Sequence, residues 1–255
     1  MHYPTDLAAA AAILLERRQL GKQGPRLPEL CRPTDLNAAL EIQTAVSARL
    51  GDRIAAWKCG LPSDDRVIMA PIFSSTVQAV SPCRVQVRTD KVRAEPELAF
   101  ILAYDLPPRE LPYTPAEVDA SIARTCLALE LIDSRFSNEA EADFLEHLAD
   151  GLFNQGLFIG PEVDNDQART ASDMPVRIRR ASGAVAELDG HHPAHDPRAP
   201  LYWLANHLRS FGQGLQAGQA VITGSYAGCI DLPFGENIAI EYGGLGSLPV
   251  CFAQE

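Results

Sequence analysis

Apolar residues recur at helical spacing near the start of the chain and mark two amphipathic helices. One is predicted over residues 5–20 and ends at a glycine, and the other begins at the cap Thr34 and runs to about residue 50. The residues between them, 21–33, are rich in Pro and Gly and predict a loop. We therefore expect a helical N-terminal region over residues 1–53.

From residue 54 onward the pattern changes to short apolar runs separated by Gly, Pro and Ser, which is typical of strands. Such runs occupy residues 54–58, 67–73, 85–88, 98–103, 126–133, 220–223, 237–242 and 248–252. Two more helices are predicted, one starting at Thr114 with a capping box and an N-terminal proline, and one over residues 200–211. This order predicts an α+β fold in which residues 54–255 form one β-rich catalytic domain, continuous with the helical region.

The composition supports a folded chain with an acidic surface. The 255 residues include 22 Lys and Arg against 33 Asp and Glu, a formal net charge of −11, and 46% of them are hydrophobic. An acidic chain without a basic block is not suited to nucleic acid or to an anionic membrane surface, and no stretch approaches the roughly 20 apolar residues of a membrane helix. We therefore expect neither nucleic acid nor a membrane as a partner. Some of the carboxylates could instead converge to bind a hard cation.

The cysteines indicate a reducing compartment. The six, at positions 31, 59, 83, 126, 229 and 251, are scattered and include no Cys-x-x-Cys pair. They are interpreted as buried thiols and not as a disulfide framework. The apolar run at 8–15 has no basic segment before it and no small-residue cleavage site after it, so it predicts a helix and not a signal peptide. We expect a cytoplasmic protein.

The first candidate for chemistry is the carboxylate pair Glu95 and Glu97. In an extended segment, residues two apart point to the same face, and the intervening Pro96 fits an edge or a bulge. Two close carboxylates repel each other unless a cation or a shared proton relieves them. The pair leads directly into the apolar run 98–102, which favours a site over the alternative, a solvated pair on an exposed edge strand.

The second candidate is Glu130, which lies in the middle of an apolar run. A carboxylate in a buried strand is costly unless it is paired, hydrogen-bonded or bound to a metal. The alternative is an ion pair with Arg135 or another basic group. Three carboxylates from two strands would suit a divalent hard ion.

A lysine and a glycine-rich turn complete the candidates. Lys58, in an apolar strand end beside Gly60, could neutralise a substrate carboxylate, or it could be a snorkelling surface lysine. The turn at 223–228 could hold an anion through backbone N–H groups and a hydroxyl. The histidines at 191–195 are predicted to be solvated in a loop, and His147 and His207 to lie on helix surfaces.

Five motifs, in order, resemble those of the fumarylacetoacetate hydrolase superfamily and, more closely, of its 2-keto-4-pentenoate hydratase and 4-oxalocrotonate decarboxylase branch. They read WKCGLPS (57–63), EPELAF (95–100), LELIDSR (129–135), LYWLANHL (201–208) and TGSYAG (223–228). The resemblance implies a mixed, barrel-like β roll of the C-terminal type found in that superfamily, with a short helical N-terminal region. It also implies a homo-oligomer.

The resemblance further implies a metal site and a substrate. Mg²⁺ or Mn²⁺ would be bound by Glu95, Glu97 and Glu130. The substrate would be a 2-oxo or 2-hydroxydienoic acid from the meta-cleavage of aromatic compounds, bound to the metal through its carboxylate and 2-oxo oxygen. Lys58, as the catalytic residue, would hold the acid together with Gly224 and Ser225.

The implied reaction is hydration of a 2-keto-4-pentenoate-type acid by a metal-dependent lyase. A 4-oxalocrotonate-type decarboxylase and an acylpyruvate C–C hydrolase would share the metal site and remain alternatives, as does a non-catalytic keto-acid-binding subunit.

Two segments depart from the family pattern. Residues 70–76 contain Ser74 and Ser75 but no carboxylate where an acid is usual, and residues 150–154 replace an Asp-Asn-Ser-type run.

Overall fold

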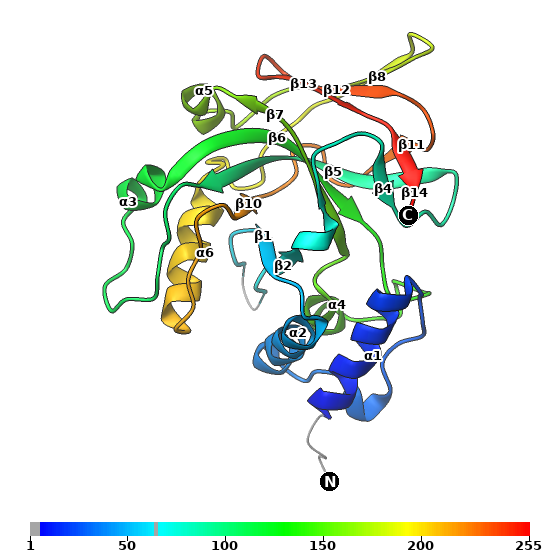
Figure 1. The fold of residues 1–255 in the computed structure, drawn as a ribbon, viewed down its shortest axis with the longest axis vertical. Coiled ribbons are helices and arrows are strands. Elements are labelled where there is room, and N and C mark those ends of the chain that lie inside the picture. Colours follow the sequence, from blue (N-terminus) through cyan, green and yellow to red (C-terminus); the bar gives the residue numbers. More distant parts are fainter. Residues whose placement is uncertain (1–5, 64–65) are drawn as a thin grey trace.

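The computed structural model describes residues 6–63 and 66–255, and within them the chain forms six α-helices and fourteen strands (Figure 1). The helices are α1 (Leu7–Leu20), α2 (Leu36–Leu50), α3 (Pro115–Ala120), α4 (Phe144–Asp150), α5 (Asn165–Arg169) and α6 (Ala199–Ser210). The strands are β1 (Ile54–Cys59), β2 (Met69–Phe73), β3 (Val77–Gln78), β4 (Cys83–Val85), β5 (Lys91–Leu102), β6 (Ile122–Ile132), β7 (Asn154–Val163), β8 (Val176–Arg180), β9 (Val185–Leu188), β10 (Ala220–Ile222), β11 (Ile230–Pro233), β12 (Ile238–Tyr242), β13 (Gly246–Val250) and β14 (Phe252–Gln254). The α+β class is confirmed.

The largest sheet is barrel-like. Its strand order is β2-β1-β10-β5-β6-β7-β3, and β11 pairs with β5. The chain runs from β2 at one edge through the short 3₁₀ turn η2 (Ser74–Thr76) into β3, which pairs with β7 at the other edge. This connection draws the two edges together, and Figure 1 shows the long strands β5, β6 and β7 arching over β1 and β2.

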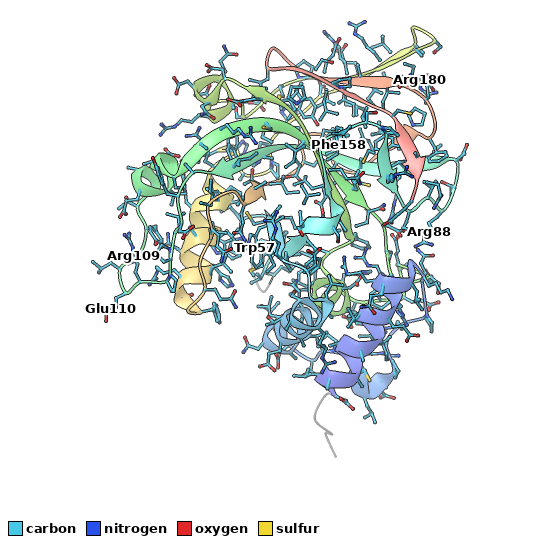
Figure 2. The ribbon with its side chains drawn as sticks, viewed as in Figure 1. Trp57, Arg88, Arg109, Glu110, Phe158 and Arg180 are labelled. Carbon is cyan, nitrogen blue, oxygen red and sulfur yellow. The ribbon has the colours of Figure 1, made fainter. Side chains whose placement is uncertain are left out.

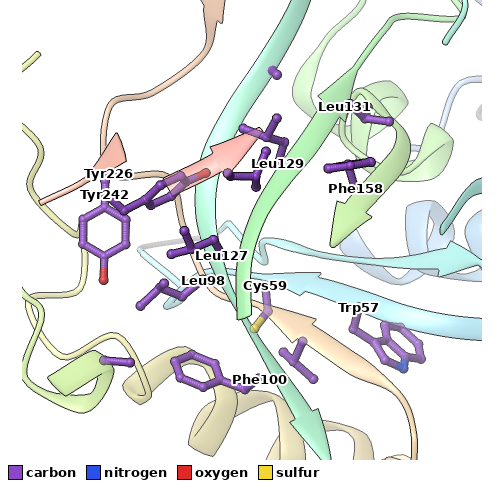
Figure 3. Close-up of a cluster of buried hydrophobic side chains, with 14 of the residues drawn as sticks. Trp57, Cys59, Leu98, Phe100, Leu127, Leu129, Leu131, Phe158, Tyr226 and Tyr242 are labelled. Atoms are coloured by element: carbon purple, nitrogen blue, oxygen red, sulfur yellow. The ribbon is translucent and has the colours of Figure 1, made fainter. Parts of the chain in front are cut away.

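The two faces of this sheet have different residues. The inner face carries small and aliphatic side chains from six strands, among them Ala56, Ala99, Ala128 and Ala220. The outer face carries the large core side chains, and Figure 3 shows part of this cluster, with Leu127 near its centre and Phe100 at its lower edge. Since successive side chains of a strand alternate between faces, Glu95, Glu97 and Glu130 fall on the inner face.

Two layers cover the outer face. Helix α6 packs on it through Leu201, Leu204 and Leu208, and a second sheet of order β13-β12-β8-β9 packs on it through residues such as Leu248 and Tyr242. A two-stranded parallel pair, β14 with β4, completes the β structure. Charged side chains such as Glu110 and Arg180 lie at the periphery, whereas Trp57 lies in the interior (Figure 2).

A second hydrophobic core joins the N-terminal helices to α4. Its buried members come from α1, α2, residues 136–152 and the segment between α1 and α2 (Leu27 and Cys31). In Figure 1 the helices α1, α2 and α4 lie together below the large sheet. Both N-terminal helices end at left-handed glycines, and Asp35, not the predicted Thr34, caps α2 by accepting the N–H of Ala38. Among the described residues no helix is long and apolar enough to cross a membrane.

Some element boundaries differ from the predictions. The predicted strand at 85–88 overlaps only the last residue of β4, and the strand predicted at 98–103 begins at Lys91. The capping box of Thr114 and Glu117 is present. The pattern did not predict α4, α5, β7, β8 or β9.

Candidate active site

The three candidate carboxylates meet on the inner face of the large sheet. Glu95 and Glu97 project from β5, and Glu130 of β6 lies directly opposite Glu95 in the register of the two strands. One carboxylate oxygen from each lies within 4.8 Å of the others. Glu97 is 2% exposed, Glu130 is fully buried and Glu95 is partly exposed. The strand geometry therefore brings together the three residues predicted from the sequence.

Pro96 lies in a central strand, at a break in its pairing. On one side of β5 the ladder with β10 ends at Ala99, and the ladder with β11 begins at Ala94. The turn that joins β10 to β11 fills the gap, and its Tyr226 N–H donates to the Pro96 carbonyl at 3.0 Å. A residue without an N–H fits here because the ladder is interrupted.

Glu130 has an ion pair with Lys58 of β1. The Lys58 Nζ lies 2.7 Å from Glu130 Oε1 and donates to the Leu152 carbonyl at 3.1 Å. Asn154 Nδ2 also donates to Glu130 Oε1, at 2.9 Å. The Lys58 side chain is only 12% exposed, so the snorkelling alternative is wrong. The predicted alternative partner Arg135 pairs instead with Asp150.

The site has more negative than positive groups, and the pKa values reflect this. Burial raises the pKa of Glu97 well above its usual value, and the charges of Glu130 and Glu95 add to the increase. Burial and Glu130 likewise raise the pKa of Glu95. For Lys58, burial lowers the pKa, but Glu130, Glu95 and Glu97 outweigh it, and the net shift is upward.

A divalent cation fits this arrangement. Glu130 Oε2 is buried and has no hydrogen-bond partner in the described structure. Three carboxylates converge, and Lys58 forms an ion pair with one of them, Glu130. Carboxylate oxygens are the donors that hard divalent ions prefer, so an ion bound there would satisfy the unpaired oxygen and the excess charge.

The stability of the metal-free protein is predicted to fall as the pH rises from about 6.5 to about 8.5. Since Glu97 and Glu95 have pKa values raised by folding, the folded state holds more protons than the unfolded chain, and raising the pH favours unfolding. Burial lowers the pKa of His192 from 6.5 to about 4. This residue therefore makes the stability rise with pH, but only below its ordinary pKa of 6.5.

Thermal unfolding in EDTA at the two pH values measures this effect. Excess Mg²⁺ should raise the Tm more at the higher pH, where binding displaces fewer protons. A Tm in EDTA that rises with pH across this range would contradict the prediction.

The turn at 223–228 connects to the carboxylates through its backbone. The Gly224 N–H donates to Glu97 Oε2 at 2.6 Å. The Ser225 hydroxyl contacts the carbonyls of Pro96 and Gly228, at 3.3 and 3.0 Å. The predicted substrate-binding residues thus lie beside the site, and their part in binding substrate stays a prediction.

Replacing Gly224 with Ala should weaken metal binding and destabilise the protein. Gly224 has φ +135°, and an added Cβ would lie 2.8 Å from Pro193 Cγ. The strain should cost about 1–3 kcal/mol and displace the N–H that orients Glu97. Calorimetric Mg²⁺ titration and thermal unfolding are the measurements.

The control is Gly228→Ala in the same turn, where φ is +64° but no atom lies within 4 Å. Equal Mg²⁺ affinity in the two variants would contradict the proposed role of the Gly224 N–H.

The prediction of solvated histidines is wrong for His192. It is 1% exposed, and its Nδ1 accepts the Ala194 N–H at 3.2 Å. His191 is exposed and bonds Asp173 at 2.6 Å. The loop folds back against the 223–228 turn, as shown by the close approach of His192 Nε2 to Thr223 Oγ1 at 3.4 Å.

His147 is also buried, contrary to its predicted place on a helix surface. It lies on α4, which packs into the second core, and its ring stacks on Phe153 with 4.2 Å between centroids. His207 lies on α6 and is partly buried.

Ser74 and Ser75 lie away from the carboxylates. In the register of β1 with β2, Lys58 lies opposite Ala70, near the start of β2. The two serines follow Phe73, at the far end of β2, which pairs with Ile54. There the Ser74 hydroxyl donates to Asp52, and the Ser75 N–H donates to the same carboxylate at 2.8 Å. These serines therefore do not occupy the site.

A cavity of about 880 Å³ lies on the other side of β1, between α2 and α6. Its lining includes Trp57, Leu40 and Phe211. Trp57 and Lys58 are consecutive in β1 and point to opposite faces, so this cavity faces away from the carboxylates. The three carboxylates and Lys58 converge instead on the inner face.

Comparison with known proteins identifies a family for this chain. A family model described as fumarylacetoacetate (FAA) hydrolase C-terminal matches residues 50–252. The chain belongs to this family. The segment that matches the FAA hydrolase family contains Lys58 and the three candidate carboxylates.

The curated relatives of this chain belong to the branch that the motifs predict, so the predicted resemblance is confirmed. The chain is 26% identical over 261 residues to 2-keto-4-pentenoate hydratase 2 of Dechloromonas aromatica (strain RCB), covering 96% of this chain and 97% of the relative. It is 27% identical over 227 residues to a 4-oxalocrotonate decarboxylase of Pseudomonas sp. (strain CF600), covering 83% and 82%.

A solved structure shares the fold. The 4-oxalocrotonate decarboxylase from Pseudomonas putida G7, complexed with magnesium and adipate, superimposes with a TM-score of 0.75 at 20% identity, covering 97% of each chain. The predicted barrel-like core with a helical N-terminal region is confirmed.

Proposed function

We propose that this protein is a metal-dependent hydratase, a lyase that adds water to a 2-oxo or 2-hydroxydienoic acid of the 2-keto-4-pentenoate type. The observation that carries the proposal is the convergence of Glu95, Glu97 and Glu130 around one buried lysine. Similarity to hydratases over nearly the whole chain supports the choice of reaction. The proposed metal is Mg²⁺, or Mn²⁺ in its place, because the donors are all oxygens.

The chain's own residues have distinct proposed roles. The three carboxylates would hold the ion, which when bound would act as a Lewis acid toward a substrate carbonyl. Lys58, held as a cation by Glu130 and by the Leu152 carbonyl, would bind the substrate carboxylate or transfer a proton. The turn with Gly224 and Ser225 would border the acid group, and its N–H keeps Glu97 oriented.

A decarboxylase of the 4-oxalocrotonate type is the second candidate. The sequence likeness to the Pseudomonas sp. decarboxylase favours it. An acylpyruvate C–C hydrolase and a non-catalytic keto-acid-binding subunit are further outcomes of the test below. The proposed partner is a small 2-oxo acid, and self-association into a homo-oligomer stays a prediction that sedimentation of the purified protein would test.

Product analysis separates these candidates. The protein is incubated with Mg²⁺ and, in turn, 2-hydroxypenta-2,4-dienoate, 4-oxalocrotonate and an acylpyruvate, with EDTA-treated protein as the control. The proposal expects the dienoate to be converted to a 4-hydroxy-2-oxo acid only with metal. CO₂ release from 4-oxalocrotonate without hydration would support the decarboxylase, and cleavage of the acylpyruvate would support the hydrolase. Binding without turnover of any substrate would support the non-catalytic subunit.

A further inference from the structure

The turn between α4 and β7 has an unusual backbone. Three successive residues are left-handed: Gly151 has φ +91°, Leu152 has φ +52° and Phe153 has φ +65°. Left-handed geometry is disfavoured for residues that carry a Cβ, and two of these three do. Such conformations persist when the surroundings hold them, and they concentrate at functional sites.

This turn supplies contacts to both members of the buried ion pair. The Leu152 carbonyl accepts from Lys58 Nζ at 3.1 Å. Asn154, the first residue of β7, donates its side-chain amide to Glu130 Oε1 at 2.9 Å. The Lys58 ammonium is therefore placed by one carboxylate and one carbonyl, and that carbonyl belongs to the left-handed residue Leu152.

A guanidinium from the first helix spans the turn. Arg18 of α1 donates through Nη2 to the Asp150 carbonyl at 2.7 Å and through Nη1 to the Asn154 carbonyl at 3.5 Å, so it contacts the backbone on both sides of the turn. Its side chain is 15% exposed, and its guanidinium lies 5.6 Å above the Phe73 ring. Arg135 bonds the Asp150 carboxylate at 2.7 Å and also donates to the Asp150 carbonyl, at 3.1 Å.

We propose that Arg18 is a positioning residue: it holds the 151–153 turn in its left-handed form, so that the Leu152 carbonyl fixes the Lys58 ammonium. The inference rests on the proposed role of Lys58 in catalysis. It assigns the N-terminal helix α1 a part in the reaction although no residue of α1 is among the carboxylates or their direct partners.

The test compares Arg18→Met with Arg17→Met, a matched control in the same helix. Arg17 donates to the Arg135 carbonyl at 3.2 Å and contacts the Phe136 ring. It interacts with the Asp150 charge but, within the described residues, donates no hydrogen bond to residues 150–154. In Arg18→Met, amide exchange of peptides covering residues 150–155 should rise roughly tenfold, as local opening becomes easier. Lys58 should also react faster with an amine reagent, as measured by mass spectrometry. Both rates in Arg17→Met should stay near those of the wild type.

The kinetic part of the test uses the same variants. Arg18→Met should lower kcat by roughly 10- to 100-fold, because a displaced catalytic group loses rate steeply, whereas calorimetric Mg²⁺ affinity should stay unchanged. Arg18→Lys should restore part of the loss. Exchange and Lys58 reactivity in Arg18→Met equal to those in Arg17→Met would overturn the inference. If the wild type turns over none of the proposed substrates, the proposed function fails, while the exchange and labelling results still decide whether Arg18 holds the turn.

Discussion

Replacing Glu97 with Gln is expected to abolish divalent-metal binding and, at the same time, to make the metal-free protein more stable. Glu97 is 2% exposed, and burial with two neighbouring carboxylates raises its pKa well above the usual value. A neutral amide of the same shape can still accept the Gly224 N–H and removes the repulsion. The gain should be about 1–2 kcal/mol at pH 8 in EDTA. Calorimetric Mg²⁺ titration and denaturant unfolding measure the two effects.

Two further variants show whether the result is specific. Glu130→Gln should also lose metal binding, but it should destabilise the protein by on the order of 3 kcal/mol, because the Lys58 ammonium loses its partner in a buried pair. Glu162→Gln makes the same charge change at an exposed position of β7 and should alter neither property. Unchanged Mg²⁺ affinity in Glu97→Gln and Glu130→Gln would refute the metal site.

Replacing Lys58 with Met is expected to remove turnover and to leave metal binding intact. The ammonium is held by Glu130 at 2.7 Å and by a backbone carbonyl, which places a fixed cation beside the carboxylates. Loss of a positioned proton-transfer group typically lowers rates by about 10²–10⁴-fold. Mg²⁺ affinity should be equal or higher, because a competing cation is removed. Steady-state kinetics and calorimetry of the variant make the comparison.

Lys91→Met is the matched control for this substitution. Lys91 pairs with Asp231 at the surface, with 55% of its side chain exposed, so its removal should change neither kcat nor metal affinity. If Lys58→Met keeps wild-type kcat, Lys58 has no catalytic role. If it instead loses Mg²⁺ binding together with activity, Lys58 supports the metal site and not the chemistry.

The candidate carboxylates could be singled out from the sequence because their spacing follows from local geometry. Glu95 and Glu97 share a face in any extended strand, and an acid such as Glu130 in a buried strand needs a partner. That Glu130 lies opposite Glu95 depends on the register of β5 with β6, which neither segment specifies alone. The resemblance to known motifs supplied what local reasoning could not.

The partners of these residues could not be predicted, because they are far apart in the chain. Lys58 and Leu152 are separated by 94 positions, and a backbone carbonyl has no sequence signature. The left-handed turn is formed by a leucine and a phenylalanine, residues that do not signal such a conformation. His192 looked solvated because the residues around it are polar, and its burial depends on how the loop folds over the 223–228 turn.

Glu95, Glu97 and Glu130 are proposed to hold one divalent ion together. The most direct test is a crystal of the protein grown with Mn²⁺ and measured with anomalous X-ray scattering. We expect a single strong anomalous peak on the inner face of the large sheet, within bonding distance of an oxygen from each of the three carboxylates. A Mn²⁺-saturated crystal with no peak between these residues, or with its only strong peak elsewhere, would contradict it.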